Sequence, residues 1–430
     1  MMKAIISTSI LNGEVHVPPS KSAMQRALAL ALLNNGETII NNFGKSKDDE
    51  TAIQIIKDLG ADVFIYDSSI KVLSKGEINP PLIINCNESG LALRMFAPII
   101  ALSGKQVRLT GTGTLNNRKI GLFEDILNAL NVQIETNNGF LPLTLNGQML
   151  PTDLVIDGSK SSQYLTGLLF AFAKSVYKPT VITVEQLVSK PYIDLSLQLL
   201  KHFGYNVIHD HYCRFIISPV KSLVSNYTYT VEGDWSSAAF FIVAAAISGD
   251  LLISGLEMNS CQSDKKIMEV LNLAGAAFNI KNEGIEVKKS DHLSAFEFDA
   301  TDCPDLFPSL TVLAINSIGI SKIKGVKRLF DKESNRASTL VSEFSKLGAS
   351  IQIDNDDMII AGGKMLIGAN VDAHHDHRIA MALAIAGLNI EGDVIINNAE
   401  SVSKSFPDFF KILKDSGGAV SLNNETITHE

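Results

Sequence analysis

The chain has 430 residues, more than one hydrophobic core usually supports, so we expect two domains. Its 37 lysines and arginines stand against 46 aspartates and glutamates, and this net charge of −9 argues against a nucleic-acid-binding surface. No apolar run reaches the roughly 18 uninterrupted residues of a membrane span, and the first residues lack a secretory pattern. The four cysteines are scattered without a CxxC pair. We therefore expect a cytoplasmic protein with reduced thiols.

Six polar turns along the chain each open into a helix-length run of small apolar residues. The turns are rich in Gly, Ser, Asp or Pro, and they begin at Pro19, Glu88, Asp157, Glu232, Cys303 and His375. The runs that follow are apolar nearly all round, which predicts buried helices. The clearest examples are residues 27–33, 165–172, 238–247 and 379–388.

A second, amphipathic run follows each buried one and stops at a residue type that tolerates the left-handed conformation. These stops lie about 70 residues apart, at Gly60, Asn131, Gly204, Gly275, Gly348 and Gly417. Residues 335–347 show the charged face that places such a helix on the outside. A β-prone stretch follows each stop, as at 61–65 and 349–353. The spacing predicts six copies of one repeat that mixes two helices with several strands.

Cationic side chains stand at the openings of these helices, where unpaired backbone N–H groups and the helix dipole favour anions. Lys21, Ser22 and Arg26 share the first opening and combine a point charge, a hydroxyl and a bidentate guanidinium. The helix dipole slightly disfavours basic residues in a first turn, so we interpret Lys21 and Arg26 as ligand-binding residues. The openings predict a site for phosphate and carboxylate groups.

Three other patterns have plainer interpretations. Taken alone, residues 332–336 are typical of a solvated helix face with i,i+3 and i,i+4 pairs. Residues 374–377 read His-His-Asp-His, but consecutive residues at a turn cannot all converge on one metal ion. Residues 43–46 end like a P-loop, yet Ile39 stands where the motif needs its first glycine. We therefore expect neither a metal site nor a Walker-type nucleotide site.

The motifs converge on a known family. Residues 19–28, with Lys21, Ser22 and Arg26 at their centre, resemble the opening of the EPSP synthases, which are enolpyruvyl transferases. Further segments resemble that family in the same order, namely residues 109–111 with 117–121, 157–165, 189–194, 232–234, 304–305, 331–336, 376–378 and 403–408. The resemblance covers all six repeats.

This resemblance implies a two-domain inside-out α/β barrel, with three βαβαββ repeats in each domain around buried parallel helices. In that family the first strand returns to the other domain, so the crossovers are expected near residues 20 and 231. The expected domains are residues 1–20 with 232–430, closed by the N-terminal strand, and residues 21–231.

The implied reaction transfers the enolpyruvyl group of phosphoenolpyruvate to the 5-hydroxyl of shikimate 3-phosphate through a tetrahedral intermediate, with release of phosphate. No metal and no organic cofactor are implied, and no nucleic acid or membrane. We expect a monomer that handles these two small substrates.

The resemblance also implies roles for individual residues. The phosphoenolpyruvate-binding set is Lys21, Gly90, Arg118, Gln163, Arg336, Arg378 and Lys404. The shikimate 3-phosphate-binding set is Lys21, Ser22, Arg26, Ser161, Ser162, Gln163, Ser189, Tyr192, Asp305 and Lys332. Addition requires an acid and a base on the two sides of the reacting atoms. The candidates are Asp305 on the hydroxyl side, and Glu333 and Lys21 on the methylene side.

Some positions depart from the family pattern. The second repeat usually shows an Asn-Ser-Gly-Thr type of turn, where this chain has Glu88-Ser89-Gly90-Leu91. Arg328 and Phe330 stand where many members carry an Asn and an Arg.

Two other functions remain as alternatives. One is enolpyruvyl transfer to UDP-N-acetylglucosamine, whose enzymes carry Lys-Asn where this chain has Lys21 and Ser22. The other is binding of phosphorylated ligands without catalysis. A binder needs cations but not carboxylates, so the presence of Asp305 and Glu333 favours an enzyme.

Overall fold

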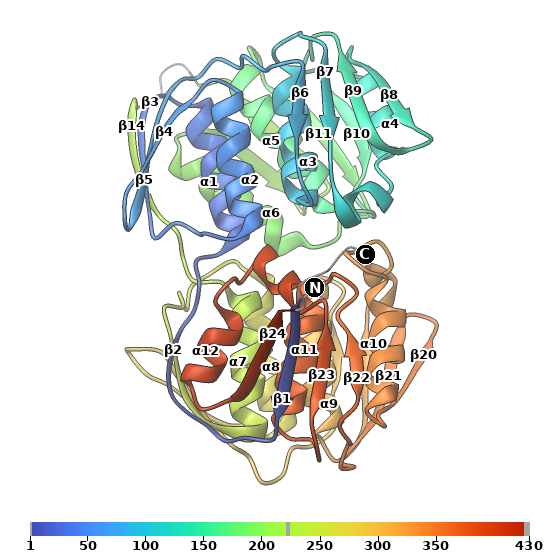
Figure 1. Ribbon diagram of the computed structural model, residues 1–430. Coiled ribbons are helices and arrows are strands. Elements are labelled where there is room, and N and C mark those ends of the chain that lie inside the picture. Colours follow the sequence, from blue (N-terminus) through green and yellow to red (C-terminus); the bar gives the residue numbers. More distant parts are fainter. Residues whose placement is uncertain (1, 221–223, 425–430) are drawn as a thin grey trace, which may run out of the picture. The chain divides into compact units, whose positions relative to one another are not determined.

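The computed structural model describes residues 2–220 and 224–424. The chain divides into two compact units, unit 1 from Met1–Pro18 with Gly233–Glu430 and unit 2 from Pro19–Glu232. The described residues form six four-stranded sheets, three in each unit. Figure 1 shows the strands of each unit standing around helices of the same unit.

One repeat of unit 2 shows the architecture of all six. Its elements in chain order are β10 (Leu154–Asp157), α5 (Ser162–Ser175), β11 (Thr180–Glu185), α6 (Lys190–His202), β12 (Asn206–Asp210) and β13 (Arg214–Ser218). β10 pairs parallel to β11, whereas β13 pairs antiparallel to both β11 and β12. The strand order is therefore β10-β11-β13-β12, and the predicted βαβαββ repeat is confirmed.

The other two repeats of unit 2 have the same sheet order. The first combines helices α1 (Lys21–Leu33) and α2 (Lys47–Asp58) with the strands β14 (Asn226–Thr230), β3 (Asn35–Asn41), β5 (Ser69–Lys75) and β4 (Asp62–Ile65). The second combines helices α3 (Gly90–Ala101) and α4 (Leu122–Asn128) with the strands β6 (Ile83–Asn85), β7 (Val107–Thr110), β9 (Phe140–Asn146) and β8 (Gln133–Asn137). A 3₁₀ turn, η1 (Gly113–Asn117), leads from β7 towards α4.

Unit 1 holds three repeats of the same design. The first has helices α7 (Trp235–Ser248) and α8 (Ile267–Ala274) with strands β2 (Leu11–His16), β15 (Gly249–Ser254), β17 (Ile285–Lys288) and β16 (Ala277–Ile280). The second has α9 (Phe307–Ile315) and α10 (Arg336–Lys346) with β18 (Glu297–Asp299), β19 (Gly319–Lys324), β21 (Asp357–Gly362) and β20 (Ser350–Asp354). The third has α11 (His377–Gly387) and α12 (Phe409–Asp415) with β22 (Asn370–Asp372), β23 (Val394–Asn397), β1 (Met2–Ser7) and β24 (Ala419–Asn424).

Two strands, β2 and β14, belong to a sheet of one unit, whereas the helix that follows each of them along the chain belongs to the other unit. β2 precedes α1 along the chain but pairs parallel to β15 in unit 1. β14 precedes α7 but pairs parallel to β3 in unit 2. The N-terminal strand β1 lies between β23 and β24 and completes the last sheet.

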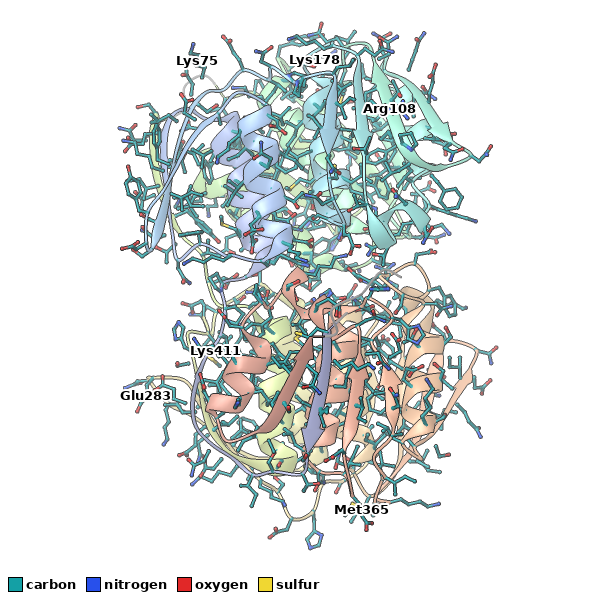
Figure 2. All side chains as sticks on the ribbon, in the orientation of Figure 1. Lys75, Arg108, Lys178, Glu283, Met365 and Lys411 are labelled. Atoms are coloured by element: carbon teal, nitrogen blue, oxygen red, sulfur yellow. The ribbon has the colours of Figure 1, made fainter. Side chains whose placement is uncertain are left out.

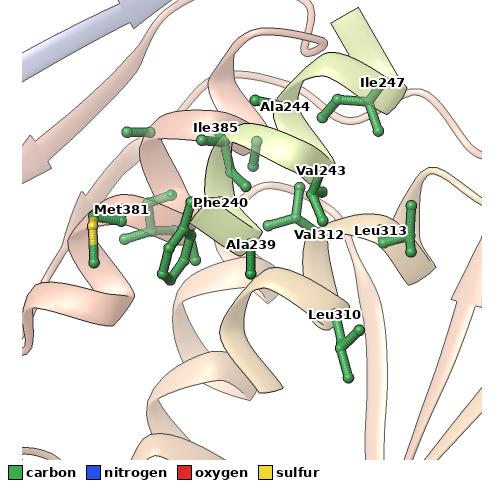
Figure 3. Packing of buried hydrophobic residues seen from close by; sticks show 14 of the residues in the cluster. Ala239, Phe240, Val243, Ala244, Ile247, Leu310, Val312, Leu313, Met381 and Ile385 are labelled. Atoms are coloured by element: carbon green, nitrogen blue, oxygen red, sulfur yellow. The ribbon is translucent and has the colours of Figure 1, made fainter. Parts of the chain in front are cut away.

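The first helix of each repeat is buried, and three such helices form the centre of unit 1. Every residue of α7 is buried. Figure 3 shows Phe240 and Val243 of α7 beside side chains of α9 and α11 such as Leu313 and Ile385. A helix that is apolar on all sides is stable only when neighbours cover every side, which these packed helices and their sheets provide. Charged side chains such as Lys75, Lys178 and Lys411 point outward (Figure 2).

The predicted helix stops are confirmed by backbone geometry. All six have positive φ, from +67° at Asn131 to +107° at Gly60. Five of the six predicted openings also place a capping side chain before a buried helix, at Ser20, Ser89, Ser161, Asp234 and Asp376.

The Cys303 opening differs from the other five. It forms a short 3₁₀ turn, η3 (Pro304–Leu306), and α9 begins only at Phe307. Pro308 offers no N–H donor, so a helix accepts it only in the first turn, and α9 begins one residue before it.

Candidate active site

In unit 1, charged residues from five segments meet at the openings of α10 and α11. Asp305 comes from η3, and Lys332 and Glu333 come from the loop before α10. Arg336 is the first residue of α10, and Arg378 is the second residue of α11. Lys404 ends the 3₁₀ turn η5 (Ala399–Lys404). All six were predicted from the sequence, and the fold brings them together.

Arg336 is the centre of this cluster. Its Nη1 donates to Asp305 Oδ1 at 2.7 Å, its Nη2 to Glu333 Oε2 at 2.5 Å, and its Nε to Asp376 Oδ2 at 2.8 Å. The side chain is 1% exposed. Burial lowers the pKa of Arg336, but the charges of Asp376, Glu333 and Asp305 outweigh burial and raise it above its usual range. The guanidinium is therefore a permanent cation whose planar fork holds three carboxylates in place.

Asp305 is surrounded by positive charge. Its Oδ2 lies 3.1 Å from Nη2 of Arg378, and its Oδ1 accepts from Lys332 Nζ at 3.3 Å as well as from Arg336. Burial raises the pKa of Asp305, but the charges of Arg378, Lys332 and Arg336 outweigh burial and hold it well below its usual range. The carboxylate is therefore ionised at neutral pH.

Two further residues complete this cluster of unit 1. Lys404 Nζ lies 3.8 Å from Glu333 Oε1, so Glu333 faces one cation on each of its oxygens. Arg328 carries a guanidinium whose pKa burial lowers and the nearby charge of Asp305 raises. The departure noted at this position therefore places an additional cation in the field of Asp305.

In unit 2, two guanidinium groups lie against the glycine that begins α3. A Cβ atom added to Gly90 would lie 2.8 Å from Nη1 of Arg118 and 2.8 Å from Nη1 of Arg94. Arg94 also donates to Gln163 Oε1 at 3.0 Å. Ser89 caps the helix by accepting from Ala92 N. Because the glycine has no side chain, both cations and the helix N-terminus border the same space.

Lys21 and Arg26 lie on the first two turns of α1 and have different environments. Lys21 Nζ donates to Asp48 Oδ2 at 2.9 Å, and both side chains are mostly buried. Arg26 is 1% exposed and donates to Ser196 Oγ at 2.9 Å and to the backbone oxygens of Ser22 and Tyr192. Burial lowers the pKa of Arg26 to about 10.

The remaining predicted residues of unit 2 stand at two helix openings. Ser161 is the N-cap of α5 and accepts from Gln163 N at 3.2 Å, and Ser162 follows it at 4% exposure. Ser189 precedes α6 in a left-handed conformation with φ of +54°. Tyr192 lies in the first turn of α6, with its ring 5.9 Å from the guanidinium of Arg26.

Three residues of the clusters in the two units were not assigned from the sequence. Asp48 pairs with Lys21, Arg94 with Gln163, and Asp376 with Arg336. Asp376 caps α11. Its position in the family-like segment 376–378 was the sequence feature that could have identified it as a site residue. An acidic residue in the first turn of a helix is common because it interacts favourably with the helix N-terminus. The sequence therefore did not indicate that Asp48 contacts Lys21.

One cavity of unit 2 is lined by other residues. It encloses about 740 Å³ in unit 2 and is lined by Arg108, Thr110, Gly111, Asn116, Asn117, Asn137, Asn138, Phe140, Leu141 and Pro142. None of the predicted substrate residues lines it. The charged clusters, rather than this cavity, therefore indicate the chemistry.

Among residues 2–220 and 224–424, no group of three His, Cys, Asp or Glu side chains could hold a metal ion. His374 instead bonds Glu343 Oε1 at 3.0 Å. No helix in the same residues is long and apolar enough to cross a membrane.

Comparison with known proteins gives a consistent result. The chain matches the family model described as EPSP synthase (3-phosphoshikimate 1-carboxyvinyltransferase) over residues 6–413. The 3-phosphoshikimate 1-carboxyvinyltransferase of Clostridium novyi (strain NT) is 37% identical over 425 residues, which cover 96% of this chain and 97% of that protein. The enzyme of the same description from Clostridioides difficile (strain 630) is 36% identical over 429 residues, with 96% and 97% coverage. The fold of EPSP synthase from Acinetobacter baumannii is similar, with a TM-score of 0.83 at 24% identity and coverage of 98% and 100%.

Proposed function

The chain belongs to the EPSP synthase family, and on that premise we propose which of its residues hold the two substrates and which move protons. The activity is the transfer of the enolpyruvyl group of phosphoenolpyruvate to the 5-hydroxyl of shikimate 3-phosphate, with release of phosphate. The protein is a transferase of the shikimate pathway. The main support for these roles is the cluster in which Arg336 bridges Asp305, Glu333 and Asp376.

Phosphoenolpyruvate carries a phosphate and a carboxylate, and fixed cations are the groups that hold both. The proposed contacts are Lys21, Gly90, Arg118, Gln163, Arg336, Arg378 and Lys404. Two features support this set. At Gly90 no side chain covers the N-terminus of α3, and two guanidinium groups lie beside it. In unit 1, Arg378 contacts Asp305 and Lys404 contacts Glu333, the two carboxylates that Arg336 also binds.

Shikimate 3-phosphate requires a phosphate site and hydrogen-bond acceptors for ring hydroxyls. The proposed contacts are Lys21, Ser22, Arg26, Ser161, Ser162, Gln163, Ser189, Tyr192, Asp305 and Lys332. The bonds that tie Arg26 to the backbone of Ser22 and Tyr192 support this grouping. Ser161 and Ser162 stand where the N-terminus of α5 favours an anion.

Proton transfer is assigned to Asp305, Glu333 and Lys21. Addition removes a proton from the 5-hydroxyl and delivers one to the methylene carbon of the donor. Asp305 is ionised, so it can accept the hydroxyl proton, but three cations make it a weak base in the ligand-free chain. When substrate anions engage Arg378 and Lys332, they neutralise part of that positive charge and raise the basicity of Asp305. Glu333 and Lys21 are the proposed groups on the methylene side.

The test of the function is phosphate release by the purified protein. We expect release with phosphoenolpyruvate and shikimate 3-phosphate together, and none with either alone or with phosphoenolpyruvate and UDP-N-acetylglucosamine. Release with the nucleotide sugar instead would establish the related transferase. Binding of both substrates without release would establish a non-catalytic binder.

We also propose that the two domains are residues 1–20 with 232–430 and residues 21–231, and that the enzyme is a cytoplasmic monomer. Cys86, Cys213, Cys261 and Cys303 are all free thiols, as is usual in a reducing compartment. Light scattering during gel filtration tests the oligomeric state, and cell fractionation tests the compartment. Limited proteolysis tests the boundaries, because cleavage is expected to concentrate near residues 20 and 231.

A further inference from the structure

Two buried charged residues of α10 contact the short segment that leads into α11. Arg336 and Glu343 are seven residues apart, so they stand on the same face of α10. Their exposed fractions are 1% and 2%. We call residues 372–376 the entry segment, because it runs from the last residue of β22 to the N-cap of α11.

Glu343 holds the first part of the entry segment. Its Oε2 accepts from the backbone N–H of Asp372 at 2.8 Å, and its Oε1 lies 3.0 Å from Nε2 of His374. Lys346 Nζ also donates to Oε2, at 2.7 Å. Burial raises the pKa of Glu343, but hydrogen bonds from Lys346, His374 and Asp372 outweigh burial and lower it. An ionised carboxylate only accepts hydrogen bonds, so Nε2 of His374 is the donor to Glu343.

The middle of the entry segment has an unusual backbone conformation. His374 and His375 have φ of +50° and +55°. Side chains other than glycine rarely adopt this conformation, and it persists where the surrounding contacts fix it. Asp372 Oδ1 accepts from His374 N at 2.6 Å and from Asn398 Nδ2 at 2.9 Å. Together with the bonds to Glu343, these contacts hold the turn that the two histidines form.

The last residue of the entry segment is Asp376, which contacts both proposed donor-binding arginines of the helix openings. Its Oδ1 accepts from Arg378 N at 3.0 Å, and its Oδ2 accepts from Arg336 Nε at 2.8 Å. One face of α10 therefore fixes the entry segment at both ends, through Glu343 at the start and Arg336 at the end. The position at which Asp376 meets Arg336 depends on the turn that Glu343 holds.

We propose that Glu343 and His374 form a positioning pair that fixes the entry segment, and so places the guanidinium groups of Arg336 and Arg378 for phosphoenolpyruvate. This inference rests on the proposed donor-binding roles of the two arginines. A displaced entry segment moves Asp376, and with it the carboxylate that binds the side chain of Arg336 and the backbone of Arg378. Loss of the pair is therefore expected to weaken donor binding.

Two substitutions of His374 separate the bond to Glu343 from the backbone conformation. Asparagine tolerates positive φ but is too short to reach Glu343, so His374→Asn removes the bond and keeps the backbone preference. Glutamine carries an amide N–H donor on a longer side chain, so His374→Gln keeps the bond although its backbone preference is less favourable. The side chain of His374 is 45% exposed, so neither variant is expected to prevent folding.

Steady-state kinetics of these variants test the proposal. His374→Asn is expected to raise the KM for phosphoenolpyruvate roughly fivefold, the effect of one lost hydrogen bond, with a smaller change in the KM for shikimate 3-phosphate. His374→Gln is expected to stay within about twofold of the wild type. The matched control is His375→Asn, the same substitution at the neighbouring exposed position with φ of +55°. Equal changes in both KM values, a Gln variant as weak as the Asn variant, or an equal effect of the control would overturn the proposal.

A double-mutant cycle tests whether the two residues act as a pair. Glu343→Ala removes the acceptor for both Asp372 N and His374 Nε2, so it is expected to raise the KM for phosphoenolpyruvate more than His374→Asn does. In the Glu343→Ala background, His374→Asn is expected to add little, because its partner is already absent. Fully multiplicative effects would contradict the pair.

A binding measurement separates this inference from the proposed function. Calorimetric titration with phosphoenolpyruvate alone involves no turnover. Weaker binding by His374→Asn, restored in His374→Gln, supports the positioning pair even if the wild type releases no phosphate. Normal turnover by the wild type together with unchanged binding by His374→Asn overturns the positioning pair alone. Absence of donor binding by the wild type would instead overturn the proposed donor site, and the inference with it.

Discussion

Arg336 and Asp376 form an ion pair with almost no exposed surface. Nε of Arg336 lies 2.8 Å from Oδ2 of Asp376, and their side chains are 1% and 0% exposed. Asp376 also caps α11 by accepting from Arg378 N at 3.0 Å. The pair therefore joins the opening of α10 to the opening of α11 and places two proposed substrate cations relative to each other.

Replacement of Asp376 by Asn is expected to destabilise unit 1. The variant keeps an oxygen for the helix cap but leaves the buried Arg336 with one carboxylate fewer. Urea unfolding is expected to show a loss of about 3 kcal/mol, in the range for breaking a buried pair. Asp291→Asn, at an exposed position of the same unit, is expected to change stability by less than about 0.5 kcal/mol.

Replacement of Arg336 by Lys is expected to abolish most activity although the charge is kept. A single ammonium on a flexible stem cannot reproduce the planar fork that contacts Asp305, Glu333 and Asp376. We expect kcat/KM to fall by roughly 100-fold or more, the size of a lost electrostatic contact in an active site. Near-normal kcat/KM in a folded variant would show that the fork is not required.

Replacement of Gly90 by Ala is expected to weaken donor binding selectively. The new methyl group would meet Arg118 Nη1 and Arg94 Nη1 at 2.8 Å, so both guanidinium groups must move. The KM for phosphoenolpyruvate is expected to rise about tenfold, with a smaller change for shikimate 3-phosphate. Gly121→Ala is the matched control, because its methyl group would be 3.8 Å from its nearest neighbour, Gly139 Cα.

The raised pKa of Asp49 predicts that the stability of the fold depends on pH. Burial raises the pKa of Asp49 from 3.8 to about 7, so the folded chain holds a proton that the unfolded chain releases. Stability from this group is therefore highest below pH 3.8 and is lost as the pH rises to about 7.

The Asp49→Asn variant tests this dependence. It removes the buried charge and retains an oxygen for the hydrogen bonds from Ser46. Thermal melts are expected to show a gain in stability over the wild type on the order of 3 kcal/mol at pH 8 and little gain near pH 4. A gain that is the same at both pH values would contradict a raised pKa.

Helices α3 and α5 approach closely at Gly167, so a larger residue at this position is expected to clash in the core of unit 2. A Cβ at Gly167 would lie 2.7 Å from Arg94 O and 2.8 Å from Met95 O, both of which are backbone atoms. Gly167→Ala is expected to lower the free energy of unfolding by about 1–3 kcal/mol through overpacking. Denaturant unfolding measures the effect, and a variant as stable as the wild type would show that the helices can separate without cost.

Local features of the sequence were sufficient to predict the six repeats. The stops at Gly60 and Gly348 need only a residue that tolerates positive φ, and the caps at Ser20 and Asp376 need only a side chain near its own helix. The apolar runs identified the buried helices because a helix without a polar face has no solvent side. Such features depend on neighbours within a few residues, so the sequence displays them directly.

The predicted site residues could be named from the family motifs, but their contacts could not. Only the tertiary structure placed Arg336 among Asp305, Glu333 and Asp376, put Arg94 and Arg118 against Gly90, and paired Lys21 with Asp48. It also decided that β2 completes a sheet with β15 and that β14 completes one with β3. These relationships join residues tens or hundreds of positions apart, and they arise from packing of whole repeats, for which a local pattern carries no signal.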